Sequence, residues 1–191
     1  MKRKIFIVIS IFMLIFTGCK SMPEEKAPLS PVIAQKGVKS AKELVSFFLS
    51  ENPEKNKAKV KRLAKYYIEE ASFEGINSDA AFVQMCLETG FLRFGNLVTE
   101  DMNNFCGLGA IDSENRGLSF PSEKLGVRAH IQHLHAYGST AQLKNDCIDP
   151  RYKYVLPRGK APDLTGLAGT WAADKEYGKK LTALLKKLEA F

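Results

Sequence analysis

The sequence lacks the motifs of several large functional classes. It contains no glycine-rich phosphate loop, no Cys/His spacing typical of zinc fingers, no nucleic-acid-binding motif and no internal repeat. Its three histidines, His130, His133 and His135, have no carboxylate-rich zinc signature around them, and we expect them to serve helix packing and hydrogen bonding. We therefore expect a protein that uses no cofactor and no metal and that has no nucleic-acid partner.

Cysteine is scarce as well. The chain has four cysteines, and one of them, Cys19, lies near the N-terminus. The other three, Cys86, Cys106 and Cys147, are an odd number, which in an exported protein allows one disulfide and one free thiol, or no disulfide. The sequence does not select a pair, and three buried small apolar side chains are an equally good interpretation.

The only long apolar run lies at the N-terminus. Residues 5–16 are apolar apart from Ser10, and they follow the basic residues 2–4. The run is too short to span a bilayer comfortably, and a basic segment followed by an apolar one is the order of a secretory signal. The sequence therefore predicts an exported protein.

The end of this run is more specific. Residues 16–19, FTGC, resemble a bacterial lipobox, in which Cys19 becomes the lipidated first residue of the mature protein. We predict a lipoprotein signal peptide at residues 1–18 and a protein anchored to a membrane of the cell envelope through Cys19, facing the periplasm or the cell exterior. An ordinary signal peptide with an incidental cysteine is the alternative.

The charge of the mature chain is modest. The formal net charge is +7, and removal of the signal would take Lys2, Arg3 and Lys4 with it, which leaves +4. A mildly basic domain suits an anionic polymer such as a cell wall, or an anionic membrane surface, but the charge is too small to indicate nucleic acid.

The remaining sequence divides into a tether and one domain. Residues 19–39 contain three prolines and little periodic apolar pattern, which indicates a flexible tether. Residues 40–191 form one mostly helical domain, with a fold of the α+β class. Apolar spacing and capping signals predict five helices, at residues 44–49, 57–73, 79–89, 123–137 and 179–188. The glycine-rich residues 103–120 predict a small β-hairpin lobe, or else an irregular one.

Glu88 is the most unusual residue of the helical part. It stands in the last turn of a predicted helix, where the negative end of the macrodipole and apolar neighbours should both raise the pKa of its carboxyl group. A carboxylic acid that stays protonated near neutral pH is what a general acid requires. A solvated glutamate at a frayed helix end explains the residue equally well, so the pattern alone leaves both interpretations open.

Five segments in a fixed order point to a family. Residues 84–96 (QMCLETGFLRFGN), 103–110, 118–139, 149–155 and 169–181 together resemble the bacterial glucosaminidases of glycoside hydrolase family 73. The resemblance implies a lysozyme-like fold with a small β-hairpin lobe beside the active-site cleft. It also implies hydrolysis of peptidoglycan between N-acetylglucosamine and N-acetylmuramic acid, peptidoglycan as the partner, and a monomer.

The resemblance also implies roles for single residues. Glu88 corresponds to the catalytic acid, and Tyr177 to a tyrosine of the C-terminal motif that we assign to catalysis. Asn104, Phe105 and Gly107 correspond to the strand that lines the cleft. Trp171, the only tryptophan, corresponds to an aromatic position suited to the apolar face of a sugar ring, with plain core packing as the alternative.

The second carboxylate that most glycosidases use is harder to place. Asp112 and Glu114 lie in the polar tip of the lobe and are the first candidates, but neither matches a family motif. Glu123 and Asp174 are further candidates without a match. Alternatively, the N-acetyl group of the substrate attacks the anomeric carbon while Glu88 protonates the leaving oxygen.

Two other functions fit the same sequence. A non-catalytic, lipid-anchored module that binds peptidoglycan would explain the lipobox, the tether and the positive charge. A muramidase would keep the enzyme and cut the other glycosidic bond. The awkward position of Glu88 favours an enzyme, because a binding module has no need of a carboxylate at the end of a helix.

Overall fold

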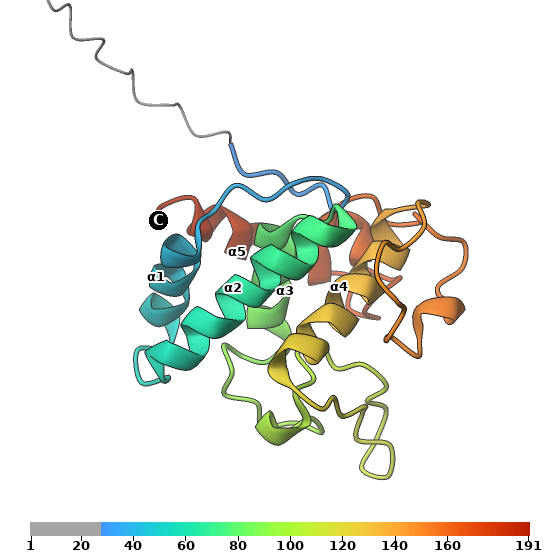
Figure 1. The fold of residues 1–191 in the computed structure, drawn as a ribbon, viewed down its shortest axis with the longest axis horizontal. Helices are drawn as coiled ribbons and strands as arrows, with labels where there is room; N and C mark the ends of the chain where they lie inside the picture. Colours follow the sequence, from blue (N-terminus) through green and yellow to red (C-terminus); the bar gives the residue numbers. More distant parts are fainter. Residues whose placement is uncertain (1–27) are drawn as a thin grey trace, which may run out of the picture.

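The computed structural model describes residues 28–191. The predicted signal peptide, Cys19 and the first part of the tether lie outside the described residues. Figure 1 shows a group of helices with an irregular lobe below them. The described part contains five α-helices and three short 3-10 helices: α1 (Ala41–Glu51), α2 (Lys57–Glu74), α3 (Ser78–Glu88), η1 (Glu100–Met102), α4 (Glu123–Gly138), η2 (Tyr152–Tyr154), η3 (Leu164–Leu167) and α5 (Tyr177–Leu188).

The helices begin and end at the signals that the sequence carries. Ser40 and Glu43 form the predicted capping box at the start of α1. The side chain of Asn77 accepts hydrogen bonds from the first backbone N–H groups of α3. Gly75, at a φ of 72°, ends α2 in the left-handed conformation that glycine adopts without strain. The five predicted helices are confirmed, with ends that differ by a few residues.

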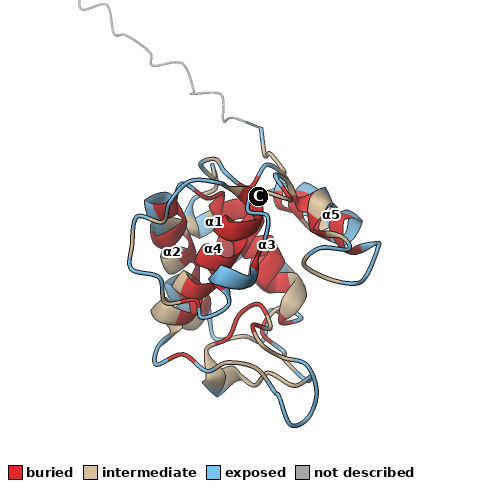
Figure 2. Cartoon of the chain, turned by 90° about the vertical axis from the view of Figure 1, so that its right-hand side faces the viewer, coloured by how far each residue is buried: buried red, intermediate tan, exposed pale blue. Residues whose placement is uncertain are grey.

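Helix α3 lies at the centre of the domain. Every residue from Ser78 to Cys86 is buried, so α3 is covered on all sides, and Figure 2 shows the buried residues concentrated where the helices meet. The core around it is rich in aromatic side chains; those that are fully buried include Phe47, Phe48, Tyr67 and Phe82. A helix fixed on all sides holds the residue at its end in one place, and that residue is Glu88.

Residues 28–39, which we assigned to the tether, pack against the helices instead. Figure 1 shows this segment running across the helices on the side opposite the lobe. Ile33 is fully buried, and its backbone exchanges hydrogen bonds with Pro162 and Asn77. At Gly138 a Cβ would overlap the Ile33 side chain, so the last turn of α4 is shaped to receive it. A single apolar residue among prolines gives no periodic pattern, which is why composition alone suggests a tether.

The lobe contains no β-hairpin, and that part of the predicted fold class is wrong. Between α3 and α4 the only strand-like pairing is an isolated bridge between Ala110 and Arg116. Gly107, Gly109 and Gly117 all have positive φ, so the backbone reverses too often for a regular ladder to form. The lobe is irregular, the alternative that the sequence left open.

The three described cysteines are free, with Cys86 and Cys106 buried and Cys147 exposed. The interpretation without a disulfide therefore holds among residues 28–191. Within the same residues, no helix has the length and apolar character needed to cross a membrane.

The packing of Ile33 predicts a clear effect on stability. Ile33→Ala should lower the free energy of unfolding by about 2–4 kcal/mol, because it leaves a cavity between α4 and the loop at Pro162. Val32, a residue that is 39% exposed, is the matched control, and Val32→Ala should change stability by less than about 0.5 kcal/mol. Urea unfolding of both variants measures the difference. Equal, small effects would contradict the packing of residues 28–39 against the domain.

Candidate active site

Glu88 is the last residue of α3 and is held by two side chains from the C-terminal part of the chain. The indole Nε1 of Trp171 donates to Glu88 Oε1 at 3.0 Å. The hydroxyl of Tyr177, the first residue of α5, donates to the same oxygen. Both hydrogen bonds therefore end on Oε1, and Oε2 receives neither of them.

The chain turns sharply after Glu88. The hydroxyl of Thr89 donates to the carbonyl of Met85 at 2.8 Å and accepts from the N–H of Leu92 at 2.9 Å. Phe91, Leu92 and Phe94 have φ between 55° and 59°, a region that residues other than glycine seldom occupy. This reversal ends α3 directly at Glu88, and the loop that follows it lines the same cavity as the carboxylate.

The environment of Glu88 keeps its carboxyl group protonated to a higher pH than usual. Burial raises the pKa of Glu88, and the hydrogen bonds from Tyr177 and Trp171 oppose this shift without cancelling it. The direction agrees with the expectation from the sequence, and burial is its main cause in the structure.

A cavity of about 450 Å³ opens in front of Glu88. Its walls come from the end of α3, the loop after it, the lobe and the segment at Trp171. At Gly107, on the lobe side, a Cβ would lie 3.8 Å from Glu88 Oε2. Among the lining residues in the described part of the chain, Glu88 is the sole carboxylate.

The other residues that we expected in the cleft fall into two groups. Trp171 and Gly107 line the cavity, and Asn104 does too, but the Asn104 side chain is occupied by hydrogen bonds to the backbone of Leu108 and Leu118. Asn104 therefore holds the lobe in shape. Phe105 does not line the cavity; it is fully buried in the main core and offers no surface to a ligand.

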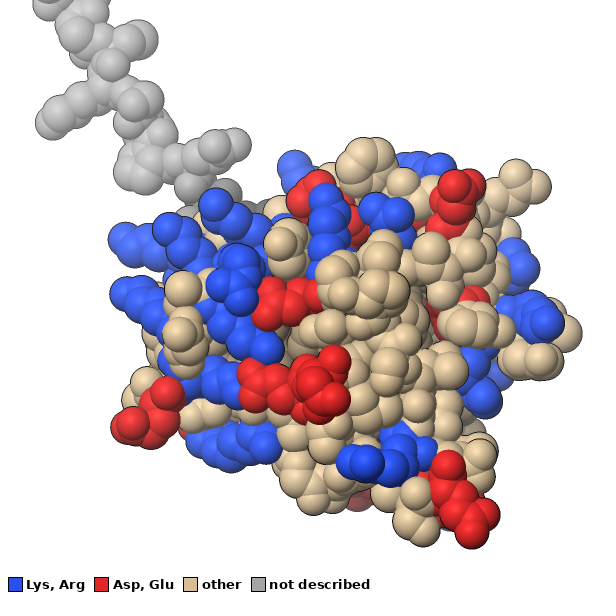
Figure 3. Space-filling model, turned by 60° about the horizontal axis from the view of Figure 1, so that its bottom comes forward, with Lys and Arg blue, Asp and Glu red and all other residues tan. Residues whose placement is uncertain are grey.

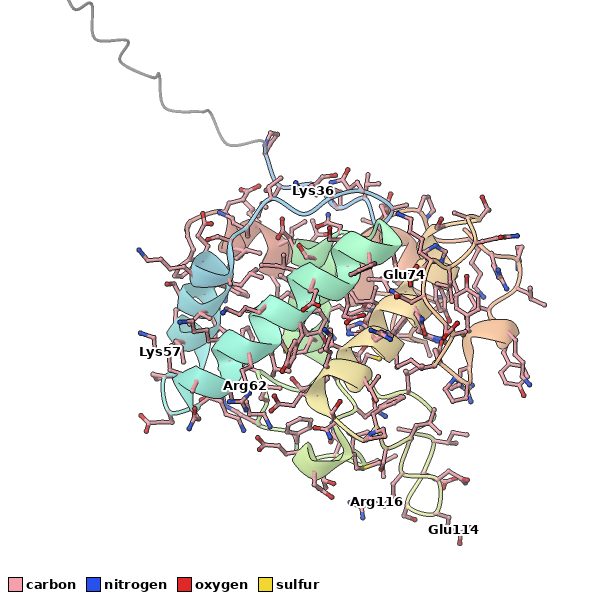
Figure 4. All side chains as sticks on the ribbon, viewed as in Figure 1. Lys36, Lys57, Arg62, Glu74, Glu114 and Arg116 are labelled. Carbon is pink, nitrogen blue, oxygen red and sulfur yellow. The ribbon has the colours of Figure 1, made fainter. Side chains whose placement is uncertain are left out.

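Asp112 and Glu114 do not approach Glu88. Both are exposed, neither lines the cavity, and Figure 4 shows Glu114 at the tip of the lobe, away from the helices. The Asp112 carboxylate caps the local turn by accepting from the N–H groups of Glu114 and Asn115.

The two further candidates for a second carboxylate are used elsewhere. Glu123 pairs with Arg62, and Asp174 pairs with Lys180. Neither of them lines the cavity. The structure thus brings no second carboxylate beside Glu88 within residues 28–191.

A set of buried polar residues lies behind Tyr177, and the sequence analysis foresaw only the hydrogen bonding of His130 among them. Gln84, one turn before Glu88 on α3, is fully buried and donates to the Tyr177 hydroxyl at 3.0 Å. His130 and Tyr67, also fully buried, continue the contacts into the core. The sequence did carry one signal for this set, because Gln84 is a polar residue on the apolar face of a predicted helix. No group of three or more His, Cys, Asp or Glu in the described residues is arranged to hold a metal ion.

Comparison with protein families agrees with this site. Residues 64–190 match the Glucosaminidase family, described as mannosyl-glycoprotein endo-beta-N-acetylglucosaminidase. This chain belongs to the glucosaminidase family. It is 42% identical over 164 residues to an uncharacterised protein of Borreliella burgdorferi, an alignment that covers 86% of this chain and 80% of that protein.

A solved structure shows the same fold. The crystal structure of S. aureus autolysin E in complex with the muropeptide NAM-L-Ala-D-iGlu superposes with a TM-score of 0.52. The match has 13% sequence identity and covers 87% of this chain and 74% of autolysin E. This glucosaminidase domain therefore has the lysozyme-like fold that the sequence resemblance implies, without the hairpin.

The raised pKa of Glu88 predicts that the carboxylate costs stability at neutral pH. Because the folded protein holds the Glu88 proton more tightly than the unfolded chain, stability from this group is present at low pH and is lost as pH rises through the folded pKa. Glu88→Gln, which still accepts both hydrogen bonds, should raise Tm at pH 7 and leave it unchanged below about pH 4. The exposed Glu114→Gln is the control and should not alter Tm at either pH. A Glu88→Gln variant less stable at pH 7 would contradict this account.

Proposed function

We propose that this protein is a peptidoglycan hydrolase, an endo-β-N-acetylglucosaminidase that cuts the glycan between N-acetylglucosamine and N-acetylmuramic acid. The observation that carries the proposal is Glu88: a carboxyl group with a raised pKa, held at the wall of an open cavity. Family membership supports the reaction class, and the muropeptide bound to autolysin E supports the substrate class.

In this proposal Glu88 acts as the general acid. Oε1 accepts from both Trp171 and Tyr177, so the carboxylic proton resides on Oε2, the oxygen toward Gly107. Oε2 donates this proton to the glycosidic oxygen as the bond to the anomeric carbon breaks, and the carboxylate that remains is stabilised by the two donors on Oε1.

The substrate supplies the second group. Paired carboxylates in glycosidases lie about 5–9.5 Å apart across the bond, and among the described residues no second carboxylate lines the cavity. We propose that the N-acetyl oxygen of the substrate attacks the anomeric carbon as the bond to the leaving oxygen breaks. Water then adds to the anomeric carbon and opens the resulting ring, and the Glu88 carboxylate takes the proton that this water loses. Glycine at position 107, with its φ of 68°, leaves the space beside Oε2 open for the sugar.

The surface around the cavity suits a polymer with a neutral backbone and anionic side groups. Figure 3 shows the face that carries the lobe, with many Lys and Arg toward the α1–α2 side, a group of Asp and Glu beside them, and an area of uncharged residues next to that group. Lys57, Lys61 and Lys65 of α2 are exposed. Stem-peptide carboxylates of peptidoglycan would meet the positive potential of the Lys and Arg side chains while the sugar rings occupy the uncharged area.

Hydrolysis of purified peptidoglycan tests the proposal directly. Glu88→Gln should reduce turbidity clearing and zymogram clearing by at least about 100-fold, because the proton donor is lost. Asp112→Asn and Glu114→Gln are the matched controls and should each keep most of the activity.

The other outcomes distinguish the alternatives. An inactive Glu114→Gln protein that still folds would place a base or nucleophile in the lobe and contradict substrate assistance. No clearing by the wild-type protein would leave the non-catalytic binding module. Mass spectrometry of borohydride-reduced products identifies the reducing-end sugar, and reduced N-acetylmuramic acid would indicate a muramidase.

We also propose that the mature protein is a monomeric lipoprotein of the cell envelope, attached to a membrane through Cys19. Residues 28–39 reach the helices on the side opposite the lobe, as Figure 1 shows. A lipid attached upstream of this segment would hold the cavity away from the membrane and toward the cell wall.

Loss of the lipidated residue tests the anchor. Cys19→Ala should move the protein from the membrane fraction to the soluble fraction of fractionated cells and abolish labelling by a radioactive fatty acid. Cys147→Ala, at an exposed free cysteine, is the control and should keep both properties. Membrane association that persists in Cys19→Ala would contradict the lipid anchor.

A further inference from the structure

A line of hydrogen bonds runs from the core of the domain to Glu88. Tyr67 Oη and His130 Nδ1 lie 2.8 Å apart, and His130 Nε2 lies 3.0 Å from Gln84 Oε1. Gln84 Nε2 donates to the Tyr177 hydroxyl at 3.0 Å, which donates to Glu88 Oε1. The line joins four elements, because Tyr67 is on α2, His130 on α4, Gln84 on α3 and Tyr177 on α5.

Burying these polar groups costs desolvation free energy unless each polar atom has a hydrogen-bond partner. Tyr67, Gln84 and His130 are each 0% exposed, and no buried side-chain nitrogen or oxygen in the described residues lacks a hydrogen-bond partner. Apolar residues of the same size would pack there at a lower desolvation cost. A complete polar line through the core of a helical domain therefore calls for a role beyond packing.

The donor directions along the line are fixed by chemistry. Gln84 Oε1 can only accept, so His130 Nε2 must carry a hydrogen. Burial lowers the pKa of His130 to about 3, so the ring is neutral and its Nδ1 is an acceptor, to which Tyr67 must donate. Gln84 in turn gives a hydrogen to Tyr177, whose own hydrogen is then directed to Glu88.

We infer that Gln84 and His130 are positioning residues, which fix the direction of the Tyr177 hydroxyl and so leave the acid proton of Glu88 on Oε2. This inference rests on the proposed function of Glu88 as a general acid. If the Tyr177 hydroxyl turned away, Oε1 would be free to carry the proton and to donate it to Tyr177. Oε1 is turned toward Trp171 and Tyr177, whereas Oε2 is the oxygen that faces Gly107 at the cavity wall.

Two other titratable groups near Glu88, Tyr177 and Cys106, do not change charge while Glu88 titrates. Burial raises the pKa of the Tyr177 hydroxyl and that of the Cys106 thiol well above the ordinary values, so both groups stay neutral over the pH range in which Glu88 titrates. The donors on Oε1 are thus the interactions with Glu88 that substitutions along the line would alter.

Gln84→Met tests the inference, because methionine fills the same space and cannot donate to Tyr177. The pKa of Glu88, read from the carboxyl carbon by NMR, should rise by about half to one pH unit, as expected for the weakening of one hydrogen bond. In hydrolysis of peptidoglycan, the basic limb of the pH profile should move upward by the same amount. At the optimum, kcat should fall about fivefold to tenfold with KM unchanged.

Gln132 provides a matched control on α4. It is also a fully buried glutamine, and the hydrogen bonds of its side chain go to the backbone of Asp146, Ile148 and Asp149. Gln132→Met should lower Tm to a similar degree and leave the Glu88 pKa and the pH profile unchanged. A pKa shift of equal size in Gln132→Met would indicate a general loss of structure and overturn the inference.

A second variant covers the case in which Gln84→Met does not fold. Tyr67→Phe removes one hydroxyl far along the line, and it should shift the Glu88 pKa upward by a smaller amount. An unchanged Glu88 pKa in a folded Gln84→Met protein, or in Tyr67→Phe if the first does not fold, would overturn the inference and leave the hydrolase proposal standing. An inactive wild-type protein would overturn the hydrolase proposal instead, and the NMR measurement would still report on the hydrogen bonds.

Discussion

The two hydrogen bonds that end on Glu88 Oε1 are the interaction on which the site depends. They come from Trp171 and Tyr177, which are more than eighty residues away in the sequence, and they distinguish one carboxyl oxygen from the other. Burial raises the pKa of this group and the two donors limit the rise. The balance gives an acid that holds its proton to a higher pH than an ordinary glutamate and whose carboxylate, once formed, is stabilised by two donors.

The rest of the fold holds Glu88, Trp171 and Tyr177 in fixed positions relative to one another. Helix α3 is buried all round and ends in a backbone reversal at Phe91 and Leu92, so Glu88 cannot move without disturbing the core. Helix α5 contacts α3 and the η3 segment that precedes Trp171. Residues 28–39 link the start of α3 to the loop at Pro162, so the segment nearest the proposed lipid anchor also helps to fix the elements of the site.

Much of this could be predicted from local sequence. Helix positions follow from apolar spacing and from caps such as Ser40 and Asn77, because these signals act over three or four residues. The upward direction of the Glu88 pKa shift could be predicted from an apolar helix end, although its main cause in the structure is burial by the packed domain. The hairpin was a wrong prediction, because three glycines with positive φ break the alternation that the pattern of small and apolar residues suggested. The predicted tether was too long, because a single buried apolar residue, Ile33, holds residues 28–39 to the domain. Gly138, which is distant in the sequence, makes room for its side chain.

The sequence by itself determined that a carboxylate would stand at the end of a helix, and its ordered motifs indicated the glucosaminidase family. Only the tertiary structure decided which groups face that carboxylate: Trp171 and Tyr177 on one oxygen, Gly107 beside the other, and a line from Tyr67 to Gln84 behind them. The tertiary structure also decided that Phe105 is buried in the core and that the carboxylates at the tip of the lobe are exposed. The physical reason is that helix formation depends on neighbours along the chain, whereas hydrogen bonds and burial at a site depend on residues that only the packing of the whole domain brings together.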